Sequence, residues 1–224
     1  MITLHHLENS RSQRIAWLLE ELGADYEVKV YQRDPVTILA PPELKAVHPL
    51  GKSPIVSDGD VTVAESGAII EYLLDKFTGH SLRPDAGTSE AREFTFWLHY
   101  AEGSVMPLML MALVMHRIET APLPFFIRPV AKGIAQKVRG NFLDDNIQRH
   151  LDFINQTLDS RPWFAGDRFS AADIQMSYCL EAAAKRADVD GKFPKIADFL
   201  VRIRGRDAYR KAESRVGSFE LPSV

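Results

Sequence analysis

The feature that most constrains this chain is a change of sequence pattern between residues 78 and 88. Before it, short alternating segments typical of strands are mixed with helical segments; after it, from about Ser89, the apolar residues recur only at helical spacing. A chain with this pattern is expected to form two domains, one α/β and one all-helical. The turn-rich residues 79–88 are the predicted linker, which places the domains at 1–78 and 89–224.

The first domain is predicted to contain a small four-stranded sheet. A strand at Ile2–Leu7 precedes a helical repeat that stops at Gly23, and apolar and charged residues then alternate over Tyr26–Val30. Two short apolar runs separated by Ser57-Asp58-Gly59-Asp60 predict a hairpin. The expected order is therefore β-α-β-β-β-α, with segments near residues 2–7, 15–22, 26–30, 54–56, 61–63 and 69–77.

The second domain is predicted to be a helix bundle. Two sets of apolar residues each share one helical face, namely Phe94, Trp97, Leu98 and Ala101, and then Leu143, Ile147, Leu151, Ile154 and Leu158. No convincing strand pattern occurs after Ser89. We therefore expect these helices to pack their apolar faces together.

Charge and cysteine content limit which kinds of partner and which cellular compartment we expect. The formal net charge is only −3, which gives no reason to expect a nucleic acid or an anionic membrane as partner. Cys179 is the only cysteine, so it predicts neither an internal disulfide nor a zinc cluster, and a reducing compartment fits. The N-terminus lacks a signal-peptide pattern, and the apolar run Val105–Met115 is too short to span a bilayer. We expect a cytoplasmic protein that binds no metal and no membrane.

Ser10 follows the first predicted strand and immediately precedes the first predicted helix. A hydroxyl and free N–H groups at a helix N-terminus stabilise negative charge, so a thiol bound there would be driven toward thiolate. Lowering a thiol pKa from roughly 8.5 by about two units requires about 2.7 kcal/mol. The alternative interpretation is that Ser10 only caps the helix, and Asn9 is a rival for either role.

Two further motifs are candidate binding features. Pro54 begins an apolar strand, so a cis bond after Ser53 would leave the Ser53 main chain free to pair with a small peptide. An ordinary trans proline at a strand start is the alternative. Glu65 and Ser66 end the last predicted strand and open a helix, where they can bind a charged ligand or serve only as surface charge and N-cap.

Taken together, these motifs resemble the glutathione site of the glutathione S-transferases. The resemblance rests on Ser10-Arg11, on His48-Pro49-Leu50-Gly51-Lys52-Ser53-Pro54 and on Glu65-Ser66. Later in the chain, Phe169–Ile174 resembles the family's helix-capping segment, with Ser170 and Asp173 as a capping box, and residues 193–212 are similar to its C-terminal helical segment. The resemblance implies a thioredoxin-like N-terminal domain, a C-terminal helix bundle, glutathione as co-substrate and a homodimer.

The resemblance also implies roles for the glutathione-binding residues. Lys52 would pair with the glycyl carboxylate, and Ser53 would offer its main chain to the cysteinyl unit ahead of a cis Pro54. Glu65 would bind the γ-glutamyl ammonium and Ser66 the neighbouring carboxylate at the helix N-terminus.

Ser10 would stabilise the thiolate, with Asn9 as its rival. The segment Leu7–Arg11 contains no tyrosine, so it resembles the serine-type, bacterial and fungal theta-like branch. It contains no cysteine either, and Cys179 lies far along the chain, which argues against chemistry that needs a protein thiol nucleophile.

An apolar second-substrate pocket is expected beside the helix that carries His99, Tyr100, Met106 and Leu110, although such residues more often serve as core packing. The function that the resemblance implies is conjugation of the glutathione thiolate to hydrophobic electrophiles, as in detoxification. The alternatives are a glutathione-dependent peroxidase or isomerase, and a non-catalytic binding or regulatory protein of the same fold.

Overall fold

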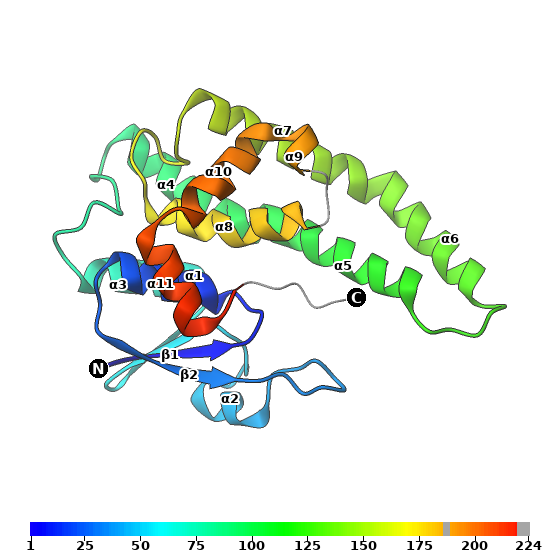
Figure 1. Cartoon of the computed structure of the whole chain (residues 1–224), viewed down its shortest axis with the longest axis horizontal. Helices are drawn as coiled ribbons and strands as arrows, with labels where there is room; N and C mark the ends of the chain where they lie inside the picture. The colour runs from blue at the N-terminus through cyan, green and yellow to red at the C-terminus, as the bar shows by residue number, and fades with distance from the viewer. Residues whose placement is uncertain (186–188, 219–224) are drawn as a thin grey trace.

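The computed structural model describes residues 1–185 and 189–218, and its N-terminal part is built on a four-stranded sheet (Figure 1). The strand order is β2-β1-β3-β4, with β1 parallel to β2 and antiparallel to β3, and β3 antiparallel to β4. The predicted strands and hairpin are confirmed. Their bounds are β1 (Ile2–Leu7), β2 (Tyr26–Tyr31), β3 (Ile55–Asp58) and β4 (Val61–Ala64).

The two faces of β1 belong to different cores. Ile2 and Leu4 are buried in the main core with α1 (Ser12–Glu21) and α3 (Ser66–Lys76), whereas Leu7 packs in a smaller cluster. Because successive side chains of a strand point to opposite faces, the adjacent His5 and His6 are also directed to opposite sides of the sheet. The members of the smaller cluster are Leu7, Tyr31, Leu44 and Ile55.

The loop before β3 contains a short helix that the sequence pattern did not predict. This helix, α2 (Pro42–Val47), lies on the opposite side of the sheet from α1 and α3 (Figure 1). The sequence indicates this helix only weakly, because Leu44 is its one buried residue and the two prolines at its start are typical of a loop as well as of a first helical turn.

As predicted, the second part of the chain is built from helices joined by loops, and no named strand lies among its described residues. Two π-helical turns, η1 (Ala101–Val105) and η2 (Arg139–Leu143), connect α4 to α5 and α6 to α7, and α5 and α6 run side by side away from the sheet (Figure 1). The helices are α4 (Ser89–Tyr100), α5 (Met106–Thr120), α6 (Arg128–Val138), α7 (Asp144–Ser160), α8 (Ala171–Ala184), α9 (Val189–Lys192), α10 (Pro194–Arg204) and α11 (Asp207–Val216).

The predicted capping box at the start of α8 is present. Asp173 accepts hydrogen bonds through Oδ2 from the Ser170 N–H and hydroxyl, at 2.8 and 3.0 Å, and through Oδ1 from the Phe164 N–H at 2.8 Å. Burial raises the pKa of Asp173 to about 6, against the opposing effect of the hydrogen bonds from Phe164 and Ser170. The box fixes where α8, which is buried along almost its whole length, begins.

One continuous core joins the two parts of the chain. Trp17 of α1 contacts Tyr209 of α11 edge-on, with ring centroids 5.1 Å apart, and Phe169 at 5.6 Å. Helix α1 is thereby held between the sheet and the helical bundle. The predicted linker 79–88 lies between the end of α3 and the start of α4, and the domain bounds themselves stay a prediction. Residues 186–188 and 219–224 of the predicted helical domain lie outside the described residues.

The run Ser89–Thr120 forms one helical segment because η1 joins α4 to α5, although the apolar stretch inside it had looked too short to span a bilayer. By length and composition alone this segment is long and apolar enough to cross a membrane, and 28% of its most apolar window is buried. One such helix is weak evidence, because core helices of globular proteins meet the same criterion. Glu102, in the middle of the segment, forms ion pairs with two arginines of the N-terminal part.

Candidate functional site

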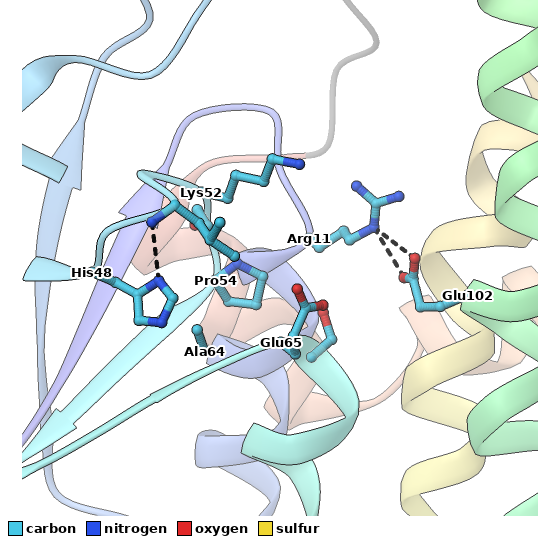
Figure 2. Close-up of a pocket in the computed structure, with 10 residues that line it drawn as sticks. Arg11, His48, Lys52, Pro54, Ala64, Glu65 and Glu102 are labelled. Carbon is cyan, nitrogen blue, oxygen red and sulfur yellow. Dashed lines mark hydrogen bonds and ion pairs between the residues drawn. The ribbon is translucent and has the colours of Figure 1, made fainter. Parts of the chain in front are cut away.

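A cavity of about 200 Å³ lies where the loops of the sheet domain meet η1 (Figure 2). Three sequence segments that are far apart in the chain line it, together with one glutamate from the helical part. The lining residues are Arg11, His48, Leu50, Lys52, Ser53, Pro54, Ala64, Glu65, Ser66 and Glu102. The predicted glutathione-binding residues Lys52, Ser53, Pro54, Glu65 and Ser66 are therefore brought together in one place.

The loop before β3 contributes a cis peptide bond between Ser53 and Pro54, which is one of the two alternatives considered for this motif. The Ser53 hydroxyl donates to the His5 carbonyl at 3.0 Å and accepts from the Leu7 N–H at 3.3 Å, so the loop is fastened to β1. Gly51 precedes it with φ of +56°, and a Cβ at Gly51 would lie 2.5 Å from the Lys45 side chain. Only glycine fits this turn without moving Lys45.

The turn between β4 and α3 places Glu65 at the cavity. Its φ of +72° is rare for a residue with a side chain, and strained backbone of this kind is found preferentially at functional sites. Figure 2 shows the Glu65 carboxylate beside Pro54, with Arg11 and Glu102 facing each other on the other side of the cavity. Ser66 begins α3, so the positive end of that helix is at the cavity wall.

A charged cluster at the cavity wall connects the two parts of the chain. The Arg11 Nε donates to both Glu102 carboxylate oxygens, at 2.9 and 3.1 Å. Arg14, whose side chain is 1% exposed, also pairs with Glu102, and it donates to the Ser66 hydroxyl at 2.9 Å and to the Gln175 carbonyl at 2.6 Å. Burial raises the pKa of Glu102, but Arg14 and Arg11 outweigh this effect and lower it overall.

Sequence reasoning missed this cluster, because Glu102 follows Arg14 by 88 positions and Arg11 by 91. An isolated glutamate in an apolar helix was the only local signal. Glu102 of the helical part holds Arg11 at the cavity directly, and it holds Ser66 indirectly through Arg14.

Ser10 lies directly behind the cavity wall. Helix α1 begins at Ser12 with Arg11 as the N-cap residue, and the Ser10 hydroxyl oxygen accepts the Ser12 N–H at 3.3 Å. The Ser10 hydroxyl donates to the Ser53 hydroxyl at 3.2 Å, which connects it to a lining residue. Asn9 adopts a left-handed backbone with φ of +50°, and its carbonyl accepts from Arg33 at 3.4 Å. The choice between Ser10 and Asn9 as the group that contacts a thiol stays a prediction.

The residues predicted for a second-substrate pocket are not among those that line this cavity. The Tyr100 hydroxyl pairs with His150 of α7, its ring stacks on Phe96 with centroids 5.2 Å apart, and burial raises its pKa to about 12. Met106 is buried in the core, whereas Leu110 and His99 are exposed. Their proposed contact with a second substrate stays a prediction.

Cys179 is unsuited to nucleophilic chemistry. It is fully buried in α8 and its thiol donates to the Ala101 carbonyl at 3.3 Å. Burial raises its pKa to about 12, so it remains a thiol at neutral pH. Within residues 1–185 and 189–218, no group of three or more His, Cys, Asp or Glu residues is arranged to hold a metal ion.

Comparison with known proteins agrees with this geometry. Residues 1–75 match the family described as "Glutathione S-transferase, N-terminal domain" and residues 124–210 match "Glutathione S-transferase, C-terminal domain". The chain is 38% identical over 217 residues to glutathione S-transferase 3 of Schizosaccharomyces pombe, covering 96% of this chain and 88% of that protein.

Solved structures agree as well. A glutathione S-transferase from Actinobacillus pleuropneumoniae superposes with a TM-score of 0.79 at 32% identity, over 98% of this chain and 95% of that one. A glutathione transferase from Phanerochaete chrysosporium, solved in complex with oxidized glutathione, gives 0.74 at 25% identity over 96% of both chains. With its thioredoxin-like sheet domain, its helical domain and these matches along both, the chain belongs to the glutathione S-transferase family.

Proposed function

We propose that this chain is a glutathione transferase that binds glutathione in the cavity between the sheet domain and η1. The observation that carries the proposal is that one cavity collects Lys52, the cis Ser53–Pro54 loop, and Glu65 with Ser66 at the N-terminus of α3. Glutathione has one ammonium group, two carboxylates and a peptide backbone, and each of these has a complementary group in that set. The Phanerochaete chrysosporium relative supports the same ligand, because it was solved with oxidized glutathione.

The γ-glutamyl end of glutathione is assigned to the side of the cavity formed by α3. Its carboxylate meets Ser66 and the positive end of the helix, and its ammonium meets the Glu65 carboxylate. Glu102 adds a second carboxylate across the cavity from Glu65 (Figure 2), although Arg11 and Arg14 already neutralise much of its charge. Charge-assisted hydrogen bonds of this kind give orientation as well as affinity.

The glycyl end is assigned to Lys52, which lines the cavity from the loop before β3. Lys52 is exposed, so its attraction for the carboxylate is partly screened by solvent and its contribution is modest. The cysteinyl unit between the two ends would then pair with the main chain of Ser53.

This placement directs the cysteinyl sulfur toward Ser10, whose hydroxyl donates to the Ser53 hydroxyl. A hydrogen bond from Ser10 to the sulfur favours the thiolate, which is the reactive form of glutathione. The thiolate attacks a hydrophobic electrophile bound against the helical domain, and the new bond joins sulfur to the electrophilic carbon. Conjugation in a cytoplasmic homodimer, with a role in detoxification, is the physiological setting that we infer from family membership.

Calorimetric titration of the purified protein with glutathione, with the ultraviolet absorbance of the thiolate recorded at pH 7, tests the proposal. Saturable binding with a thiolate signal supports an enzyme that activates the thiol. The absence of binding at millimolar glutathione would favour a non-catalytic protein of this fold.

Two matched variants assign the group that contacts the sulfur. Ser10→Ala should lose most of the thiolate signal at pH 7 and about 10²-fold in turnover, by analogy with removal of one stabilising donor. Asn9→Ala, one position earlier, should keep most of the thiolate signal and most of the turnover. The reverse order would transfer the role from Ser10 to Asn9.

A further inference from the structure

A chain of hydrogen bonds leads from the cavity wall into the interior of the sheet domain. Ser53 Oγ accepts from Ser10 Oγ at 3.2 Å, Ser10 Oγ lies 2.7 Å from Ser12 Oγ, and Ser12 Oγ lies 2.8 Å from His6 Nδ1. Ser10, Ser12 and His6 are all buried. The hydroxyl assigned to the glutathione sulfur is thus connected through one other hydroxyl to a buried imidazole.

The second ring nitrogen of His6 determines the direction of these hydrogen bonds. The backbone of Val216 in α11 raises the pKa of His6, as a carbonyl beside a ring N–H does. Since Nδ1 faces Ser12, we assign the N–H of neutral His6 to Nε2. Neutral His6 therefore presents a lone pair at Nδ1, and the Ser12 hydroxyl must donate to it.

This direction limits what Ser10 can do while His6 is neutral. With the Ser12 proton directed to His6, Ser12 Oγ can only accept from Ser10. The single hydroxyl proton of Ser10 is then engaged by Ser12 or Ser53, its neighbours at 2.7 and 3.2 Å. If His6 gains a proton, Nδ1 becomes a donor, Ser12 turns its hydroxyl toward Ser10, and the Ser10 proton is free to face the cavity.

We infer that His6 is the acceptor of the glutathione thiol proton, which reaches it through Ser10 and Ser12. The inference rests on the proposed function, since it requires the sulfur to contact Ser10. In the step, the S–H bond breaks as its proton passes to Ser10 Oγ, the Ser10 proton passes to Ser12 Oγ, and the Ser12 proton passes to His6 Nδ1. The products are a thiolate that accepts a hydrogen bond from Ser10 and an imidazolium, so no proton leaves the protein and no other reactant is needed.

The surroundings of His6 suit this role. Burial lowers its pKa most strongly, while the Val216 backbone and the charge of Glu8 raise it, and the net shift is downward. His6 is therefore neutral at pH 7 before glutathione binds and is able to accept a proton. Once the thiolate has formed, its negative charge stabilises the imidazolium across a region of low dielectric constant.

The adjacent His5 provides a matched control. It faces the opposite side of the sheet, where its ring nitrogens bond the hydroxyls of Tyr31 at 2.9 Å and Ser57 at 3.0 Å. Its imidazole has no place in the chain that ends at Ser10. Replacing it removes a buried imidazole from the same strand without interrupting the path from the cavity.

Counting protons during glutathione binding tests the inference on the unmodified protein. The titration is run at pH 7 in two buffers with different heats of ionisation, and the protons released are compared with the thiolate formed. The expected result is thiolate formation with almost no proton release. Release of about one proton per thiolate would overturn the role of His6 and leave the proposed function intact, whereas binding without thiolate would contradict both.

Variants locate the acceptor. His6→Gln and Ser12→Ala should each release about one proton for every thiolate that still forms. At a pH below the pKa of the bound thiol, both variants should also contain about tenfold less thiolate than the unmodified protein. Ser12→Thr keeps the hydroxyl and His5→Gln keeps the path, so both should retain the proton count of the unmodified protein. If His6→Gln does not fold, the proton count of Ser12→Ala tests the path instead. The imidazole NMR shifts of the unmodified protein give a second test, because they should show that His6 becomes protonated when glutathione binds. An unchanged count in Ser12→Ala would refute the path.

Discussion

Removal of the Glu102 carboxylate should destabilise the protein and weaken glutathione binding together. Glu102 pairs with Arg14, whose side chain is 1% exposed, and with Arg11, which is 34% exposed, while Glu102 itself is 32% exposed. Removing one partner of a fully buried ion pair costs about 3–5 kcal/mol, because the other charge is left buried. In Glu102→Gln one acceptor oxygen remains, and Arg14 keeps its bonds to Ser66 and the Gln175 carbonyl.

Partial exposure reduces this cost further, because solvent screens the charges. We expect a loss of about 2 kcal/mol in the free energy of unfolding, which for a chain of this length lowers the Tm by about 4–8 °C. The KM for glutathione should rise about three- to tenfold, which corresponds to about 1 kcal/mol, because Arg11 at the cavity loses its ionised partner and the Arg14 that holds Ser66 is less firmly fixed.

Urea and thermal unfolding, with glutathione titration of the folded variant, measure both effects. Asp75→Asn is the matched control, because Asp75 pairs with Arg83 at the surface and is 69% exposed. That pair should contribute about 0–1 kcal/mol. Equal stability losses in the two variants would refute the reasoning that the buried arginine makes Glu102 costly to remove.

The pH dependence gives a second check on Glu102. Its pKa in the folded protein is lowered, with burial opposing and Arg14 and Arg11 favouring the ionised form. The stabilisation from Glu102 is therefore complete above the unfolded pKa of about 4.3 and is lost as the pH falls through the folded pKa. The stability difference between the unmodified protein and Glu102→Gln should be constant near pH 7 and should narrow below about pH 4.

Three further predictions concern single residues. Lys52→Met should raise the KM for glutathione about threefold, which corresponds to about 0.7 kcal/mol for an exposed pair, with kcat within about twofold. The difference should vanish for glutathione esterified at the glycyl carboxylate, and an undiminished difference would mean that Lys52 does not meet that group. Asp173→Asn should lower the free energy of unfolding by about 2 kcal/mol, because one of the two carboxylate oxygens that accept from Phe164 and Ser170 is replaced by a donor. Since burial raises the pKa of Asp173 to about 6, above its unfolded value of about 3.9, its contribution should decline as the pH rises from about 4 to about 6, a trend that the variant should lack in urea unfolding. Cys179, with its pKa raised to about 12, should resist thiol reagents in the folded protein while transferase activity is unchanged, and rapid labelling with loss of turnover would show that α8 opens.

Much of the fold could be predicted from the sequence because the patterns that specify it are local. The strand Ile2–Leu7 and the hairpin from Ile55 to Ala64 follow from alternation and turn residues. The capping box depends on Ser170 and Asp173, which are three positions apart. Helix α2 was missed because it buries only Leu44 and begins with prolines that also suit a loop.

The glutathione-binding residues could be proposed because each lies in a short motif at the end of a strand or the start of a helix. Parallel and antiparallel pairing in one sheet then brings those ends to the same cavity. The second-substrate residues had no such motif. Apolar spacing around Tyr100 and Met106 is equally consistent with core packing, which is where the structure places Met106.

The sequence by itself determined the division into an α/β part and a helical part, the four strands, and the motifs around Ser53 and Glu65, because periodicity, turn chemistry and capping act between neighbouring residues. The tertiary structure alone decided that Glu102 neutralises Arg14 from 88 positions away and that His6 reaches Ser10 through Ser12. These contacts depend on which face of β1 packs against α1 and on η1 lying close enough to α1 for Glu102 to reach Arg14. They are set by the packing of whole elements around one core, which no local pattern specifies.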